Sequence, residues 1–148
     1  MCLLKGGVMK NCWRLGTILF VLMCLASTAA FAEVVVIANK GVSETSMTKD
    51  RVKQIFLGKV VKWQDGSRIH FVTLKGDSHK DFLKEYIGRS EAQYKTYWKK
   101  ILFTGKGSMP KSFDTEEEMA RYVANTAGAI GYVGTNAATE NVATITVN

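Results

Sequence analysis

The sequence predicts an α/β fold with a mixed, mainly parallel sheet flanked by helices. Short apolar runs, typical of strands, alternate along the chain with longer stretches of helical periodicity. The runs at 34–38 and 129–133 are almost continuously apolar, as in strands buried on both faces. The segments between the elements are short, which indicates one layered domain of four strands and four helices.

The elements of the first half follow in order from residue 34. A strand at 34–38 leads into a polar loop at 39–47. Thr48 is a suitable N-cap for a helix at 49–57, and Gly58 follows in the position where glycine commonly ends helices. A linking segment with an Asp-Gly turn then precedes the next strand.

A strand, a tight turn and a helix form the centre of the prediction. Residues 69–74 are mostly β-branched or apolar and indicate a buried strand, and Gly76 belongs to the turn. We expect Ser78 to cap the helix, with Asp81 as the acidic member of a loose capping box. Gly88 then ends the helix.

A capping box of Ser90 and Gln93 predicts a further helix that runs to about Phe103. Its apolar residues recur at helical spacing, so we expect them to form one face in the core rather than a surface for stacking a ligand. They are Tyr94, Tyr97, Trp98, Ile101 and Leu102.

The chain closes with one helix and two strands. Thr115 is expected to cap the helix and Gly128 to end it. Residues 129–133 form a short buried strand, and residues 142–147 alternate as a last strand. We expect this last strand to pair with the first.

Residues 1–32 have the features of a secretory signal. Positive residues precede an apolar core at 15–25, which is short for a membrane span, and residues 30–32 (Ala-Phe-Ala) form a cleavage site. We therefore expect export to the periplasm, cleavage near Ala32 and no stable membrane insertion afterwards. Two alternatives stay open: Met9 as the true start, and an uncleaved anchor helix.

Composition and charge narrow the function of residues 33–148, the expected mature domain. All three cysteines precede it, so it has no disulfide, no thiolate metal ligand and no cysteine nucleophile. The chain's formal net charge is +7, and +4 remains after the three positive charges of the signal; it is scattered, which suits a small anionic ligand better than nucleic acid. Without a His-x-x-x-His pair or a Gly-x-Ser-x-Gly elbow, we expect no metal, no cofactor and no enzymatic activity.

The turn after the strand at 69–74 is a candidate anion site. A helix that begins just beyond the carboxyl end of a strand directs unpaired N–H groups and the positive end of its dipole at the crevice. Lys75 and Lys80 add positive charge, and His79 is expected to lie solvated at the helix start. The alternative is an ordinary turn with solvated lysines.

Three motifs together resemble one protein family. They are Ile-Phe-Leu-Gly at 55–58 with Trp63 and Asp-Gly at 65–66, the strand, turn and helix ending at Phe82, and Gly-Ala-Ile-Gly-Tyr-Val at 128–133. Because of these motifs, residues 33–148 resemble the phosphate-binding proteins of ABC transporters. They resemble more closely the short single-domain periplasmic members of that superfamily. The resemblance implies a type II periplasmic binding fold, with material for mainly one of its two lobes.

The resemblance also implies where an oxyanion binds. By position, the candidates in the anion loop are Lys75, Gly76, Ser78, His79 and Lys80. The loop after the first strand supplies further donors, Ser43, Thr45 and Ser46. Two features depart from the full-length members: Ser-His-Lys replaces Ser-Gly-Thr at the helix start, and a lysine stands where an arginine would make a bidentate contact.

Two functions from different classes are compatible with these residues. The first is a periplasmic solute-binding module for phosphate or a similar oxyanion, with an ABC transporter permease or another periplasmic or envelope protein as partner. The second is a protein-interaction module that keeps the fold without tight ligand binding. A phosphate-dependent rise in melting temperature distinguishes the first from the second.

Overall fold

The computed structural model describes residues 33–148, so the predictions for residues 1–32, including the export signal and the three cysteines, lie outside the described residues. The strands are β1 (Val34–Ala38), β2 (Ser46–Met47), β3 (His70–Leu74), β4 (Lys111–Phe113), β5 (Ala129–Gly134) and β6 (Ala143–Val147). The helices are α2 (Lys49–Phe56), α3 (Asp77–Phe82), the π-helical segment η1 (Leu83–Ile87), α4 (Glu91–Phe103) and α5 (Glu116–Asn125). The predicted α/β class is confirmed.

The strands form one mixed sheet in the order β2-β6-β1-β5-β3-β4. The pairs β2–β6, β3–β4 and β3–β5 are parallel, whereas β1 is antiparallel to both β5 and β6. The expected pairing of the first and last strands is therefore confirmed. The two strands that the sequence did not predict, β2 and β4, have only two and three residues, too few to show an alternating pattern.

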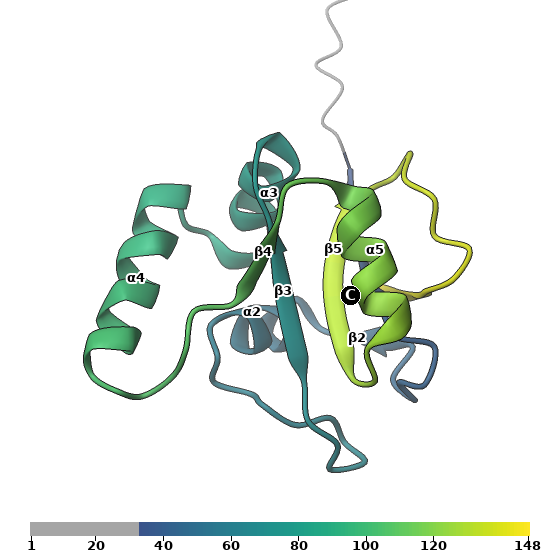
Figure 1. Cartoon of the computed structure of the whole chain (residues 1–148), viewed down its shortest axis with the longest axis horizontal. Coiled ribbons are helices and arrows are strands. Elements are labelled where there is room, and N and C mark those ends of the chain that lie inside the picture. Colours follow the sequence, from purple (N-terminus) through teal and green to yellow (C-terminus); the bar gives the residue numbers. More distant parts are fainter. Residues whose placement is uncertain (1–32) are drawn as a thin grey trace, which may run out of the picture. The chain divides into compact units, whose positions relative to one another are not determined.

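Helix α5 packs on one face of the sheet, and α2 and α3 lie on the other (Figure 1). Successive residues of β5 show both faces, because side chains alternate along a strand. Gly131 makes room for α5, since a Cβ there would lie 2.7 Å from Met119 Sδ. The Tyr132 ring points the other way, stacking on Phe82 of α3 at 3.8 Å and meeting Phe56 of α2 edge-on at 5.7 Å.

Helix α4 is attached to the end of α2. The hydroxyls of Tyr94 and Tyr97 donate to the carbonyls of Phe56 and Leu57 at 2.8 and 2.7 Å. Tyr94 and Trp98 are buried, and Tyr97 packs half-buried against the core. The expected core role of these aromatic residues is confirmed.

Leu102 departs from the predicted buried face: the residue is 50% exposed. Each step of four residues rotates about 40° beyond a full turn of helix. Leu102 lies two such steps after the buried Tyr94, so it has turned away from the line that faces the core. The pattern of apolar residues is wider than the face that the rest of the domain can cover.

Three of the predicted helix caps are confirmed. Thr48, Ser90 and Thr115 each accept a hydrogen bond from the backbone N–H three residues later. The end of the last helix is a correction: α5 ends at Asn125, because the next residue already has extended backbone angles. Gly128 instead lies directly before β5.

Candidate functional site

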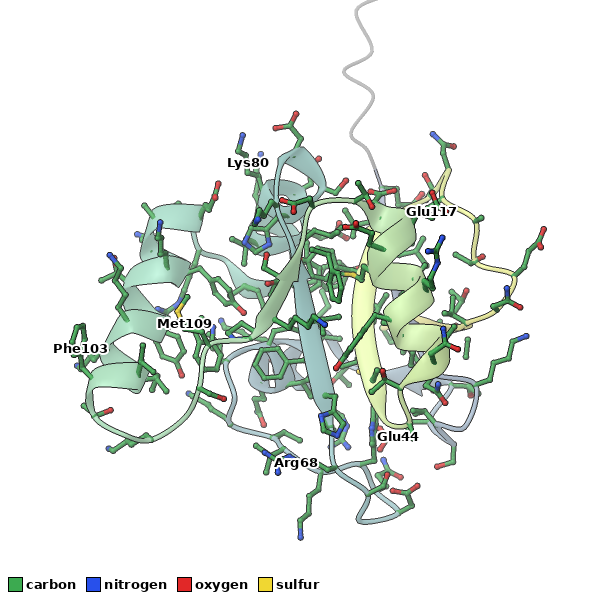
Figure 2. The ribbon with its side chains drawn as sticks, viewed as in Figure 1. Glu44, Arg68, Lys80, Phe103, Met109 and Glu117 are labelled. Atoms are coloured by element: carbon green, nitrogen blue, oxygen red, sulfur yellow. The ribbon has the colours of Figure 1, made fainter. Side chains whose placement is uncertain are left out.

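The two predicted groups of anion donors lie at opposite edges of the sheet, that is, at opposite ends of its strands. β1 is antiparallel to β5, with Ala38 beside Ile130, whereas β3 is parallel to β5, with His70 beside Ala129. β1 therefore ends where β3 begins. Figure 2 shows this separation, with Glu44 from the loop after β1 low in the view and Lys80 high. The structure does not bring Ser43, Thr45 and Ser46 together with residues 75–80.

A buried carboxylate organises the loop after β1. The three predicted donors of this loop are exposed, whereas Glu44 between them is buried. Glu44 accepts hydrogen bonds from Arg51 Nε and Nη2 at 3.0 and 2.9 Å and from Gln64 N at 2.8 Å. The bidentate contact ties the loop to α2. Sequence reasoning missed Glu44 because its partners lie on other elements.

The turn after β3 brings Ser78 onto a carboxylate. The prediction that Ser78 caps α3 is wrong: the N-cap is Gly76, whose φ of 87° is a left-handed value that favours glycine. Ser78 therefore lies inside the first turn. Its hydroxyl donates to Glu116 Oε1 at 2.6 Å, and the same oxygen accepts from the backbone N–H of Gly134 at 2.9 Å.

The two predicted lysines of this turn are each paired with a carboxylate. Lys75 Nζ lies 2.7 Å from Asp114 Oδ1, and Lys80 Nζ lies 2.9 Å from Asp77 Oδ1. All four side chains are more than half exposed, so water screens both pairs and they are weak. With Glu116, this edge of the sheet brings two lysines together with three carboxylates.

His79 is buried, which corrects the expectation that it is solvated. Its Nδ1 lies 2.5 Å from the Tyr132 hydroxyl oxygen, which also accepts from Leu74 N at 2.9 Å. The Leu74 N–H can only donate, so the Tyr132 oxygen accepts from it. The Tyr132 hydroxyl proton is then donated to His79 Nδ1, and the neutral imidazole ring carries its own proton on Nε2. Burial lowers the pKa of His79, and the Glu91 carboxylate opposes this with a smaller effect.

This shift of the His79 pKa predicts a loss of stability on acidification. The histidine of the unfolded chain binds a proton near pH 6.5, whereas the folded one binds it only at lower pH. Below about pH 6.5 the unfolded state therefore holds more protons, and the free energy of unfolding falls as the pH falls toward the folded pKa. Asparagine can accept from Tyr132 without titrating, so His79→Asn should lose less stability between about pH 7.5 and 5.5.

The matched control is His70→Asn, which makes the same change at an exposed position at the start of β3. Urea unfolding at several pH values measures all three proteins. The control should keep the pH profile of the parent. Equal slopes for His79→Asn and the parent would show that the buried histidine is not the group responsible.

The structure also allows two searches among residues 33–148. No three His, Cys, Asp or Glu side chains there are arranged to hold a metal ion. None of the helices in that part of the chain is long and apolar enough to cross a membrane.

Comparison with known proteins identifies the fold. A family model described as a PBP superfamily domain matches residues 25–147. The chain belongs to this superfamily. The superfamily agrees with the one that the sequence resemblance implied. A comparison with curated proteins finds no match.

Solved structures share the fold of this PBP domain at low sequence identity. An ABC-type phosphate transport receptor from Vibrio cholerae is 16% identical, with a TM-score of 0.57, over 77% of this chain and 45% of that one. PstS from Borrelia burgdorferi is 17% identical, with a TM-score of 0.58, over 78% and 47%. A protein assigned to phosphate ABC transporters, from Clostridium perfringens and with bound phosphate, is 18% identical, with a TM-score of 0.60, over 77% and 44%. The PBP domain thus spans less than half the length of each structure.

Proposed function

We propose that this PBP domain binds phosphate or a similar oxyanion at the edge of the sheet where β3 and β5 end. The main support is that Ser78 Oγ and Gly134 N converge on one negatively charged oxygen, Glu116 Oε1. A hydroxyl and a backbone amide directed at the same oxygen are donors of the kind that proteins use for oxyanions. Lys75 lies in the turn after β3 and Lys80 in α3, and both are exposed enough to reorient.

The similar solved structures support the ligand class. One is described as a phosphate transport receptor, and another contains bound phosphate. By analogy, phosphate is the ligand that we propose, and an ABC transporter permease or another envelope protein is the partner that we propose. The predicted export signal places this function in the periplasm, and intact-mass analysis of the secreted protein checks whether the mature chain begins near Glu33.

At the proposed site, Glu116 holds the position that an external anion would take. Its carboxylate already accepts from both donors. Two like charges about 4 Å apart repel by about 4 kcal/mol near a protein surface, so a divalent anion binds only when this side chain turns away. Glu116 therefore lowers the affinity of the site for phosphate.

We expect Glu116→Ala to bind phosphate at least about tenfold more tightly than the parent, because both donors become free and the repulsion disappears. Adding Ser78→Ala should reverse this gain, because a hydrogen bond to a charged group contributes about 1.5–3 kcal/mol. Calorimetric titration with phosphate, sulfate and chloride measures both effects.

The control for this experiment is Glu118→Ala, which removes an exposed carboxylate from the same first turn of α5. It should bind phosphate as the parent does. If Glu116→Ala gains nothing over this control, the anion does not bind at Ser78 and Gly134.

A second function is favoured by the same contacts. The hydroxyl, the amide and both lysines of the candidate site already have partners within the chain. A domain whose anion site is internally satisfied could serve as a protein-interaction module. If neither the parent nor Glu116→Ala binds any oxyanion at millimolar concentration, this second function replaces the first.

A further inference from the structure

Helix α4 presents to solvent a face that neither the core nor the candidate anion site uses. Ala92, Thr96, Lys99 and Phe103 recur every three or four residues, which places them on one side of the helix. This side lies opposite the buried aromatic residues that attach α4 to α2. Figure 1 shows α4 at one flank of the sheet, and Figure 2 shows Phe103 at the far end of the helix.

The end of this face is apolar and open to water. Phe103 is 88% exposed, and Leu102 beside it is 50% exposed. Phe103 follows Lys99 by four residues and Lys100 by three, so both lysines lie next to it on the helix surface. An exposed aromatic ring between lysines is a suitable anchor for a partner that has both an apolar side chain and acidic groups.

The positive charge of the domain is concentrated around the same helix. Residues 89–106 contain five positive residues and one glutamate, a net charge of +4. Residues 33–148 as a whole also carry +4, so the remainder of this domain is neutral. The excess positive charge is therefore carried by one stretch of the sequence, most of which forms α4, and there it favours a negatively charged partner.

The surface beside α4 is concave. One hollow of about 880 Å³ is bordered by Arg89 and Lys95 and, on its other side, by Lys80 of the candidate anion site. A second hollow of about 700 Å³ is bordered by Arg89, Tyr97 and Lys100. The two adjoin at Arg89, whose guanidinium lies over the Tyr97 ring at 5.0 Å. These two open hollows offer room for a polypeptide segment beside Lys95 and Lys100, and Phe103 lies outside both of them.

We propose that the α4 face binds an acidic segment of a partner protein, with Phe103 as the apolar anchor and Lys95, Lys99 and Lys100 as contacts for carboxylates. α4 has 13 residues and is about 20 Å long, so an extended segment of about six residues spans it. This interaction goes beyond oxyanion binding and does not depend on it, because none of these residues belongs to the Ser78 and Glu116 contact.

The test uses a fluorescently labelled peptide of about eight residues, rich in glutamate with one central leucine. We expect it to bind the parent at low salt and to be released as salt screens the charges. Phe103→Ala and the double variant Lys99→Glu/Lys100→Glu should each weaken binding about tenfold or more. The substituted side chains are exposed, so the variants should stay folded.

The matched control is Lys40→Glu/Lys62→Glu, which changes the charge equally at exposed lysines outside α4. It should keep most of the affinity of the parent. Equal losses of peptide affinity in the two double variants would mean that only net charge matters and would overturn the proposal. The absence of peptide binding at low salt would also overturn it.

Binding to phosphatidylglycerol vesicles that requires Phe103, without peptide binding, would replace the proposed protein partner with a membrane contact. Glu116→Ala should change phosphate binding but not peptide binding, so this proposal and the oxyanion function can fail separately.

Discussion

Replacing Trp98 by alanine is expected to lower the free energy of unfolding by about 3–5 kcal/mol, the range for buried aromatic side chains shortened to alanine. The Trp98 ring is buried and lies 5.5 Å from the Phe71 ring, between centroids, and 5.6 Å from the Tyr97 ring. It also contacts the turn after α2, since a Cβ at Gly58 would lie only 2.7 Å from Trp98 Cη2. The cavity left by alanine therefore opens between α4 and the rest of the core. Urea unfolding measures the loss, provided that both proteins have the same m value.

Trp98→Phe is the matched control for this prediction. Trp98 Nε1 is buried and has no hydrogen-bond partner among the described residues. Phenylalanine keeps an aromatic ring and removes the unsatisfied donor, so we expect a cost of about 1.5 kcal/mol or less. A loss of less than about 1 kcal/mol in Trp98→Ala would show that this ring does not hold α4 in place.

The elements that the sequence predicted best have local signals. Thr48, Ser90 and Thr115 cap helices through contacts three residues away, and a single sequence shows such spacings directly. The aromatic residues of α4 are a second case, because helical spacing reveals a buried face. The same logic failed at Leu102, since spacing alone does not tell how far the rest of the core extends.

The candidate site was predicted less completely because its contacts join distant elements. Ser78 meets Glu116 across 38 residues, and His79 meets Tyr132 across 53. In the sequence, Glu116 has a sufficient local explanation, an acidic first turn that complements the helix dipole, so nothing pointed to Ser78. The direction of β1 was equally hidden. An antiparallel β1 moves the loop that follows it to the far edge of the sheet, which separates the two predicted groups of donors.

Gly128→Ala is expected to destabilise the domain by about 3 kcal/mol or more, through strain and lost hydrogen bonds together. Gly128 has a φ of 73°, and a Cβ there would lie 2.3 Å from the carbonyl oxygen of Arg68. That oxygen belongs to the backbone, so the chain itself must shift. The shift disturbs two hydrogen bonds to the Gly128 carbonyl, from His70 N and from Trp63 Nε1, both 3.0 Å long. Urea unfolding against the parent measures the loss.

Gly66→Ala separates the two causes, because Gly66 has a φ of 85° but a Cβ added there would meet no atom within 4 Å. It should show only the cost of the left-handed backbone, about 1–2 kcal/mol. The excess loss at Gly128 then reports the displaced contact between the starts of β3 and β5. At their other ends, β3 leads to Ser78 in α3 and β5 ends at Gly134. The Gly128 variant should therefore also bind phosphate more weakly than the Gly66 variant when both are folded. Equal stability losses in the two variants would mean that the backbone absorbs the extra atom, and the site would then be independent of this contact.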